Sequence, residues 1–372
     1  MTNPCKQKRF VSHGGDVWGF SRKYGIPLEK VLDFSGPINY LGPAPKAVEA
    51  VKEHAKLIRF YPDPNPVEFK TEITKYVGHG VSAANVLLGN GSIELIYMAP
   101  EMFPRGFKAV IPVPSFTEYE KATLRVSGEP VYVQLPPDFA LNVTDIEKAV
   151  TKDTRIMFIC NPHSPSGTLY SRETLLDLVE FCQKKGVLFS VDENYIEFAE
   201  KGEEATLAGY VKKYENLFVI RSVTKFYGMP GIRFGYGLAA ENLVDTLQTV
   251  KLPWSINGLV GVAVMAAFKD KEFIENTKHT IDKEKAQLAK LLTEIGGLQV
   301  FPSVTNFLLV KIVNPKITST ALREELAKEG LLIRDCCTFV GLDNRYFRVT
   351  VRSEVDNRRL IDAIKEKMKT AN

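Results

Sequence analysis

The feature that most constrains the fold of this chain is a regular alternation of strand-like and helix-like segments between Val86 and Asp192. Short apolar runs typical of buried strands alternate there with longer stretches whose apolar residues have helical spacing. The strands are expected at Val86–Leu88, Ala109–Val113, Pro130–Gln134, Ile156–Cys160 and Val187–Val191. The helices are expected at Ser92–Met102, Thr117–Val126, Thr144–Val150 and Ser171–Lys185. Repeated strand–helix units with short links predict an α/β fold with a mostly parallel sheet covered on both faces.

The rest of the chain indicates a large domain followed by a small one. Two further strands are expected at Leu217–Ile220 and Phe234–Ala239, and a long helix, about Lys271–Ile295, has the length of a connector. Strands expected at Leu331–Arg334 and Tyr346–Val351 belong to a small α+β domain. The 372 residues therefore divide into an N-terminal arm or loops that contribute to the site (1–42), a large domain (43–270) and a small C-terminal domain (271–372).

One lysine motif, Arg221-Ser-Val-Thr-Lys-Phe-Tyr-Gly-Met-Pro-Gly-Ile-Arg233, follows an apolar strand. Ser222 and Thr224 flank Lys225, and Arg233 follows at a short distance along the chain. A lysine can form a Schiff base with an aldehyde cofactor, while hydroxyls and a guanidinium hold that cofactor's phosphate. The motif therefore predicts a pyridoxal 5'-phosphate enzyme with Lys225 as its catalytic lysine and with the large domain as the cofactor-binding domain. The alternative is a surface lysine in a Gly-Pro turn.

Two further segments are candidates for cofactor contacts. Gly89-Asn-Gly-Ser92 follows a strand and opens a helix, so the backbone N–H groups at Gly91 and Ser92 are expected to bind the cofactor phosphate. A Gly-x-Gly turn alone is common and weakly informative. In Pro114-Ser-Phe-Thr-Glu-Tyr119, Phe116 is expected to stack on the pyridine ring, although an aromatic residue there could equally belong to the core.

An apolar strand ends in a carboxylate at Asp192, and Tyr195 follows three residues later. The carboxyl end of a sheet strand is a common place for site residues. A carboxylate beside the pyridine nitrogen would keep that nitrogen protonated, which lets the ring accept electrons from the substrate. Asp192 is expected in that role, and Tyr195 is expected to hydrogen-bond the phenolic oxygen of the cofactor. The alternative for Asp192 is a helix cap.

Candidate substrate residues lie at both ends of the chain. Arg334 and Arg348 follow or interrupt apolar strands, where a buried arginine is costly unless it meets an anion. They indicate a substrate with two anionic groups, or else intramolecular salt bridges. His13 stands beside Gly14 and Gly15, which would let a backbone approach a ligand closely, so it is also a site candidate.

Composition excludes several other classes of protein. The net charge is +4, and positively and negatively charged residues are interspersed along the chain, which is not typical of a nucleic-acid-binding protein. Five cysteines without metal-ligand spacing indicate reduced thiols in a cytoplasmic protein, and no metal site is expected. The N-terminus lacks the pattern of a secretory signal, and the longest apolar run, Leu259 to Phe268, is too short to cross a membrane.

Across nearly its whole length the chain resembles the fold-type I pyridoxal-phosphate enzymes of the histidinol-phosphate aminotransferase branch, and within that branch the threonine-phosphate decarboxylases of cobalamin synthesis. The motifs that carry the resemblance are His13-Gly-Gly, Asp33-Phe-Ser, Arg59-Phe-Tyr-Pro-Asp, Gly89-Asn-Gly, Arg221-Ser-Val-Thr-Lys-Phe-Tyr, Pro253-Trp-Ser-Ile-Asn257, Leu332-Ile-Arg-Asp-Cys336 and Gly341-Leu-Asp-Asn-Arg-Tyr-Phe-Arg348. The lysine motif is shared by the wider superfamily, whereas the first motif and the last three point more sharply to the decarboxylases.

The resemblance implies a homodimer in which Tyr61 reaches the cofactor phosphate of the partner subunit. It also implies that His13, Gly14, Arg334 and Arg348 bind the phosphate and carboxylate of the substrate. The implied reaction is decarboxylation of O-phospho-L-threonine to aminopropanol phosphate, or of O-phospho-L-serine to ethanolamine phosphate. The alternatives are an aminotransferase of the histidinol-phosphate type and a regulatory protein that binds the cofactor without turnover.

The chain departs from the family pattern at two positions that contact substrate. Pro37 and Ser164 stand where the family usually has asparagine, and the second asparagine normally touches both the cofactor oxygen and the substrate. Serine offers one hydroxyl in place of an amide. Asn39 and Asn161 are close in sequence and are the candidates to compensate.

Overall fold

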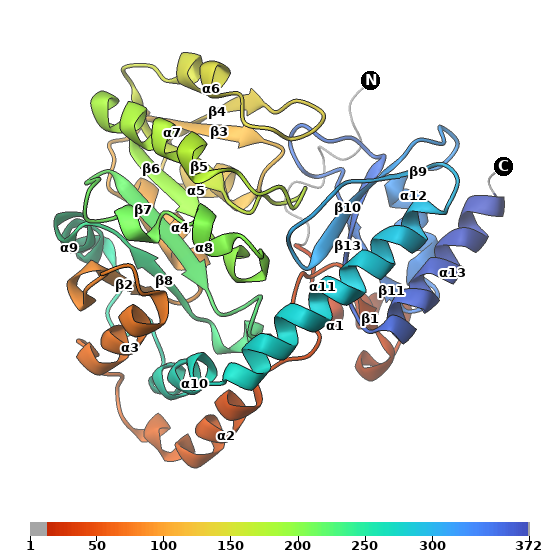
Figure 1. Ribbon diagram of the computed structural model, residues 1–372, viewed down its shortest axis with the longest axis horizontal. Helices are drawn as coiled ribbons and strands as arrows, with labels where there is room; N and C mark the ends of the chain where they lie inside the picture. The colour runs from red at the N-terminus through yellow and green to blue at the C-terminus, as the bar shows by residue number, and fades with distance from the viewer. Residues whose placement is uncertain (1–12, 371–372) are drawn as a thin grey trace. The chain divides into compact units, whose positions relative to one another are not determined.

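The structure is a computed structural model that describes residues 13–370 of the chain (Figure 1). These residues form two compact units. The larger unit contains Leu41–Ser164 and Thr168–Asn276, and the smaller unit contains residues 13–40, 165–167 and 277–370. The first twelve residues of the expected N-terminal arm lie outside the described residues. The described remainder of that arm groups with the C-terminal residues in the smaller unit.

The larger unit is built on a seven-stranded sheet with the strand order β2-β8-β7-β6-β5-β3-β4. Its strands are β2 (Val86–Gly89), β3 (Lys108–Val113), β4 (Glu129–Gln134), β5 (Thr154–Cys160), β6 (Leu188–Asp192), β7 (Leu217–Ser222) and β8 (Gly235–Leu238). The strands from β7 to β4 pair in parallel, whereas β8 is antiparallel to both β7 and β2. The expected α/β fold with a mostly parallel sheet is confirmed.

Helices cover both faces of this sheet (Figure 1), which explains why β6 and β7 are buried along their whole length. One pair of helices in mutual contact is α4 (Ser92–Glu101) with α5 (Glu118–Arg125), and another is α6 (Val143–Ala149) with α7 (Arg172–Lys185). Helix α7 ends where a glycine allows a left-handed turn. That residue is Gly186, with φ of 66°, whose N–H caps the last carbonyls.

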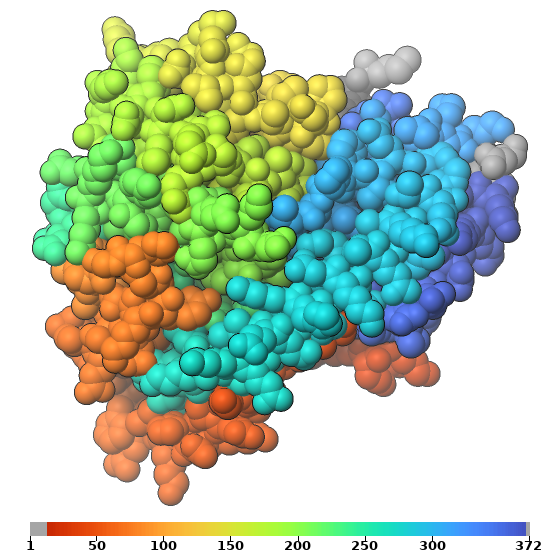
Figure 2. Space-filling view, in the orientation of Figure 1, coloured from red at the N-terminus to blue at the C-terminus, as the bar shows by residue number. Residues whose placement is uncertain are grey.

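The larger unit also contains other helices. They are α2 (Pro45–Glu53), α3 (Val67–Val77), α8 (Gly202–Ala205), α9 (Glu241–Val250) and α10 (Gly258–Phe268). Figure 2 shows α2 and α10 side by side at the surface, and the two helices pack against each other. Helix α11 (Lys271–Thr293) begins in the larger unit and continues in the smaller one.

The smaller unit has two sheets. A four-stranded antiparallel sheet has the order β12-β13-β10-β9, and β1 (Leu32–Asp33) pairs in parallel with β11 (Leu331–Leu332). The strands of the first sheet are β9 (Leu298–Val300), β10 (Phe307–Ile312), β12 (Arg334–Asp335) and β13 (Tyr346–Thr350). The single strand expected at residues 331–334 is therefore wrong, because β11 and β12 pair with different strands.

Three helices complete the smaller unit: α1 (Val17–Tyr24), α12 (Ser319–Ala327) and α13 (Glu354–Thr370). Helix α1 lies in the segment that was expected to be an arm or loops. The Asp16 side chain caps its start by accepting a hydrogen bond from the Gly19 N–H at 2.8 Å, and Gly25 ends it with φ of 67°.

Candidate active site

The carboxyl ends of neighbouring parallel strands meet at one edge of the large sheet and carry several of the expected cofactor residues. Strands β3, β5, β6 and β7 run in the same direction. Phe116 follows β3, Asp192 ends β6 and Ser222 ends β7. Because parallel strands place their carboxyl ends at the same edge, these residues converge there. Lys225 lies in the turn that follows β7.

Gly91, Ser92, Arg233 and Gly235 form a cradle at the start of α4. Gly91 caps this helix with φ of 78°, and a side-chain carbon at Gly91 would lie 2.5 Å from the Arg233 guanidinium. A side-chain carbon at Gly235 would lie 2.4 Å from the backbone nitrogen of Ser92. Helix N–H groups and a guanidinium in contact are the donors that a phosphate group requires. The cradle fits the phosphate of the expected cofactor.

Arg233 adopts a backbone conformation that arginine rarely takes. Its φ is 57°, in the left-handed region, and its Nη1 donates to the backbone oxygen of Pro230 at 3.0 Å. Such a conformation costs on the order of 1 kcal/mol and persists where the surrounding structure requires it, often at functional sites. In this protein the left-handed conformation occurs at the residue whose guanidinium lies beside Gly91.

The hydroxyls beside the lysine are linked to one another. Ser222 Oγ lies 2.7 Å from Thr224 Oγ1 and 3.0 Å from the backbone oxygen of Phe234, and the Thr224 N–H donates to Ser222 Oγ at 3.0 Å. Asn194 Nδ2 donates to Ser92 Oγ at 2.9 Å, which joins the end of β6 to the cradle. The Oδ1 atom of Asn194 is buried and has no hydrogen-bond partner among the described residues.

Asp192 is buried, with 4% of its surface exposed, at the end of β6. Its Oδ2 accepts a hydrogen bond from the Tyr119 hydroxyl at 2.8 Å, and its Oδ1 accepts one from the Asn194 N–H at 3.0 Å. Burial raises the pKa of Asp192 to about 6, although these hydrogen bonds and the charge of Lys225 oppose the rise. A cationic ring nitrogen would supply the counter-charge that this buried carboxyl needs.

The sequence did not identify Tyr119 and Asn194 as partners of Asp192. Tyr119 closes the motif from which only Phe116 was selected, and the two rings meet edge-on with centroids 5.7 Å apart. Tyr119 also stacks on Phe158 with centroids 5.0 Å apart, which holds its hydroxyl toward Asp192. Tyr195, with 7% exposed, lies immediately before the short helix Ile196–Phe198.

The smaller unit brings together the expected substrate residues. Arg334 and Arg348 are directly opposite each other on β12 and β13. Arg348 Nη2 donates to the backbone oxygen of Ser35 at 3.3 Å, and a side-chain carbon at Gly14 would lie 2.0 Å from that same oxygen. A cavity of about 430 Å³ is lined by His13, Gly14 and Arg334, among other residues of this unit.

The two candidate replacements for the missing asparagines have other partners. Asn161 Oδ1 accepts from the Tyr170 N–H at 2.8 Å, and its Nδ2 donates to the Tyr170 carbonyl oxygen at 3.4 Å. Asn39 Nδ2 donates to Thr277 Oγ1 at 3.0 Å. Ser164 is itself buried, with 4% exposed. These partners leave Ser164 as the polar side chain at the position of the second missing asparagine.

Tyr61 belongs to an apolar patch on the larger unit. Its side chain is 83% exposed, and its ring lies 5.2 Å from that of Trp254, which is 55% exposed. Other large apolar side chains exposed in the adjoining chain segments are Ile58, Phe60, Val67 and Leu252. An exposed apolar cluster of this kind is typical of a protein interface.

Among residues 13–370, no group of three or more His, Cys, Asp or Glu side chains could hold a metal ion. In the same part of the chain, every helix is too short or too polar to cross a membrane.

Comparison with known proteins gives both a family match and close relatives. The profile of the family "Aminotransferase class I and II" matches residues 29–364. A provisionally named threonine-phosphate decarboxylase of Caldanaerobacter subterraneus subsp. tengcongensis is 36% identical over 95% of this chain and 93% of its own. The threonine-phosphate decarboxylase of Salmonella typhimurium is 31% identical over 95% of this chain and 96% of its own.

Among solved structures, the histidinol-phosphate aminotransferase from Clostridium acetobutylicum superposes with a TM-score of 0.84. It is 31% identical and covers 91% of this chain and 100% of its own. The expected fold-type I architecture is confirmed. The relatives divide between decarboxylases and aminotransferases.

Proposed function

The chain belongs to the aminotransferase class I and II family and uses pyridoxal 5'-phosphate, and on that premise we propose that it decarboxylates an O-phosphorylated amino acid. The first candidate substrate is O-phospho-L-threonine, which would give 1-amino-2-propanol phosphate for the nucleotide-loop linker of cobalamin. The second is O-phospho-L-serine, which would give ethanolamine phosphate.

The observation that carries the proposal is the pairing of Arg334 with Arg348. Both guanidiniums are buried, and neighbouring strands present them at directly opposed positions. Planar guanidiniums bind phosphate and carboxylate oxygens through paired hydrogen bonds, so a doubly charged phosphate suits this pair. The threonine-phosphate decarboxylases reported above among the relatives support the same substrate class.

Each expected cofactor residue would have a defined role. When bound, pyridoxal phosphate supplies a ring that accepts the electron pair of a bond broken at the substrate's α-carbon. Asp192 would keep a proton on the ring nitrogen, Tyr195 would hydrogen-bond the phenolic oxygen, and Phe116 would stack on the pyridine ring. The cofactor phosphate would be held by Gly91, Ser92, Ser222, Thr224 and Arg233. Lys225 would be the amine that holds the cofactor's aldehyde group, with water released, and its Nζ would hold or deliver a proton at the substrate's α-carbon.

The residues of the smaller unit would select which bond breaks. A bond to the α-carbon is weakened when it stands perpendicular to the ring, because its electrons can then enter the π system. Where Arg334, Arg348 and His13 hold the substrate phosphate, the carboxylate can stand out of plane and leave as carbon dioxide. A proton from Lys225 or water then takes its place. Ser164 would lie near the cofactor oxygen and would offer a hydroxyl where the family usually has an amide.

The alternative function is an aminotransferase of the histidinol-phosphate type. In that case the α-hydrogen stands perpendicular, and Lys225 removes it. The identity with the Clostridium acetobutylicum enzyme, 31%, equals that with the Salmonella typhimurium decarboxylase, so similarity supports both reactions. The lysine motif serves either one.

The proposal includes a cytoplasmic homodimer in which Tyr61 contacts the cofactor phosphate of the partner subunit. The exposed patch around Tyr61 and Trp254 supports an interface there. The described cysteines form no disulfide, which accords with a reducing compartment.

The deciding experiment mixes the purified cofactor-loaded enzyme with O-phospho-L-threonine and, separately, with O-phospho-L-serine. We expect carbon dioxide and the amine phosphate in equal amounts with steady turnover, and the ratio of kcat/KM values would name the preferred substrate. Absence of carbon dioxide together with conversion of the cofactor to pyridoxamine phosphate would establish the aminotransferase instead. Absence of both with either substrate would overturn the assignment of an O-phosphorylated amino acid.

A further inference from the structure

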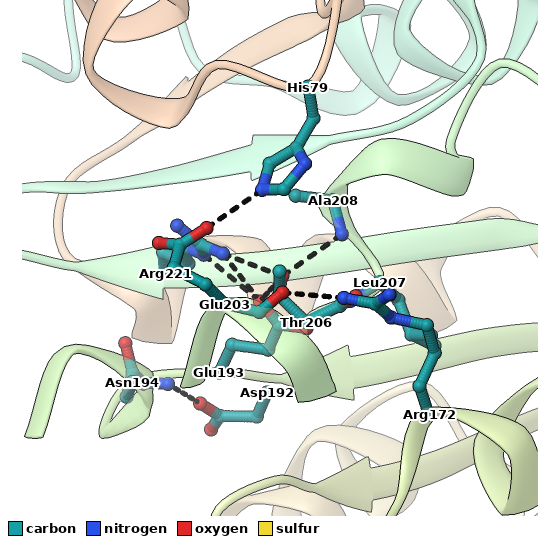
Figure 3. Close-up of polar contacts among 10 residues, drawn as sticks. All are labelled: His79, Arg172, Asp192, Glu193, Asn194, Glu203, Thr206, Leu207, Ala208 and Arg221. Atoms are coloured by element: carbon teal, nitrogen blue, oxygen red, sulfur yellow. Dashed lines mark hydrogen bonds and ion pairs between the residues drawn. The ribbon is translucent and has the colours of Figure 1, made fainter. Parts of the chain in front are cut away.

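Glu193 and Arg221 form a buried ion pair next to the two strand ends that carry the cofactor residues (Figure 3). Arg221 Nε lies 3.0 Å and its Nη2 2.9 Å from Glu193 Oε2, and the side chains are 4% and 0% exposed. Each partner is a sequence neighbour of a site residue, since Glu193 follows Asp192 and Arg221 precedes Ser222. None of the expected cofactor contacts uses either of them.

The ion pair lies on the opposite side of the strands from Asp192 and Ser222. Strands β6 and β7 pair in parallel, with Asp192 beside Ile220, and the Glu193 N–H donates to the Ile220 carbonyl at 2.8 Å. Because side chains alternate along a strand, Glu193 and Asp192 point to opposite faces, as do Arg221 and Ser222. Figure 3 shows Asp192 with Asn194 apart from the group of Glu193, Arg221 and Thr206.

A third residue closes this group into a network. Thr206 Oγ1 donates to Glu193 Oε2 at 2.7 Å and accepts from Arg221 Nη2 at 2.7 Å. The Leu207 N–H donates to the other carboxylate oxygen, Oε1, at 2.8 Å. Both oxygens of Glu193 therefore have donors, and three chain segments meet at one carboxylate. Such a satisfied buried network fixes geometry tightly because the low local dielectric strengthens each contact.

Stability alone is a weak explanation for this ion pair. Replacing a buried ion pair with apolar side chains of similar volume is often neutral or stabilising, because removing two charges from water is costly. A pair placed directly behind Asp192 and Ser222 instead has a geometric consequence. It joins the residue that follows β6, which ends in the carboxylate, to the end of β7, which leads to Lys225.

We infer that Glu193 and Arg221 are positioning residues that align Asp192 with Lys225 for the bound cofactor. They touch neither cofactor nor substrate and act through the strand ends. The inference concerns cofactor alignment and holds whether the enzyme decarboxylates or transaminates its substrate.

The test uses Arg221→Lys, which retains the charge but loses the planar fork, and Arg221→Met, which removes both. The matched control is Glu203→Gln, in the segment just before Thr206. Its side chain is 80% exposed and pairs with His79 Nε2 at 3.0 Å. The readouts are the visible circular dichroism per bound cofactor, the dissociation constant of the cofactor and the melting temperature.

We expect both Arg221 variants to lose most of the dichroic band and to bind the cofactor about tenfold more weakly. Glu203→Gln should match the unaltered protein. If an Arg221 variant does not fold, Glu193→Gln keeps the side-chain shape and one acceptor oxygen but loses the second acceptor and the charge, and it should show a loss of the same band. A lower melting temperature with unchanged dichroism and cofactor affinity in the Arg221 variants, or in Glu193→Gln when those do not fold, would overturn the inference.

Discussion

Arg334 and Arg348 lie directly opposite each other on the antiparallel strands β12 and β13. Only 8% of the first and 5% of the second is exposed. Burial lowers the pKa of Arg334, and the charge of Arg348 acts in the same direction. Two guanidiniums so placed repel each other, and an anion that accepts hydrogen bonds from both would relieve that repulsion.

Arg348→Met should therefore raise KM for the phosphorylated substrate by roughly 10- to 100-fold, because a hydrogen bond to a charged group contributes about 1.5–3 kcal/mol. Steady-state kinetics with each candidate substrate would measure this. Arg345→Met is the matched control, since Arg345 lies three residues away and pairs with Asp343 at 3.2 Å at the surface. Equal changes in KM for the two variants would contradict a substrate role for Arg348.

Lys225→Ala should remove the visible absorbance that a covalently attached cofactor gives, because no other amine would take its place. The measurement is a spectrum of the protein after loading with pyridoxal phosphate and desalting. The control is Lys201→Ala, which removes an exposed lysine and should keep the absorbance band. A band that persists in Lys225→Ala would show that another residue carries the cofactor.

Gly235→Ala should weaken cofactor binding and lower stability by about 1–3 kcal/mol, because the added methyl would lie 2.4 Å from the Ser92 backbone nitrogen. Gly231→Ala is a close control. A methyl at Gly231 meets no atom within 4 Å, so its effect on stability should stay within about 0.5 kcal/mol. Denaturant unfolding and cofactor titration of both variants would measure the difference. Similar losses in the two would show that the cradle is not tightly packed.

The cofactor-free protein should become less stable as the pH rises from about 5 to 7. Burial raises the pKa of Glu197 to about 7 and that of Asp192 to about 6, above their usual values of 4.5 and 3.8. Between the pKa values of the unfolded and folded states, the folded protein keeps these two carboxyls protonated while the unfolded chain has released the protons. The free energy of unfolding therefore falls as the pH rises, until the pH passes the pKa values of the folded state. Glu197→Gln should flatten the profile of unfolding free energy against pH, whereas Glu200→Gln at the surface should not. A stability that falls with pH to the same extent in both variants would contradict the assignment to Glu197.

Mixing two inactive variants tests whether Tyr61 serves the partner subunit. Tyr61→Ala retains Lys225, and Lys225→Ala retains Tyr61. A hybrid dimer would therefore contain one complete site if Tyr61 acts across the interface. We expect activity to appear when the two variants are unfolded together and refolded, and none when each is treated alone. Failure to recover activity, with hybrid dimers present by mass measurement, would place Tyr61 in its own subunit's site.

Local sequence patterns predicted the strands of the large sheet because β5, β6 and β7 are continuous apolar runs. They could not predict that β8 runs antiparallel, since its direction is set by pairing with β7 and with the distant β2. Helix α10 was noticed only as an apolar run, because a uniformly apolar segment has no helical period to detect. The sequence also could not predict that the strand expected at residues 331–334 is divided at Ile333. This division depends on the pairing of β11 with β1 and of β12 with β13.

The same division applies to the site. Lys225 and Asp192 could be predicted as site residues because short motifs in the local sequence indicate their chemistry. The partners of Asp192, Tyr119 and Asn194, could not, because the fold brings the Tyr119 hydroxyl to the carboxylate from helix α5, and the Asn194 contact depends on the turn that follows β6. The pairing of Glu193 with Arg221 was equally invisible, since it depends on the register between two strands.

The pairing of β1 with β11 has a consequence for synthesis on the ribosome. Leu32 and Asp33 find their strand partners only at Leu331 and Leu332. At about 5–20 residues per second, translation of the intervening chain takes on the order of tens of seconds. During that time the larger unit can complete its sheet, whereas β1 has no strand to pair with until β11 has been synthesised. A ribosome that stalls after Asn276 would leave a folded larger unit tethered to an unpaired N-terminal segment, a natural substrate for chaperones and proteases.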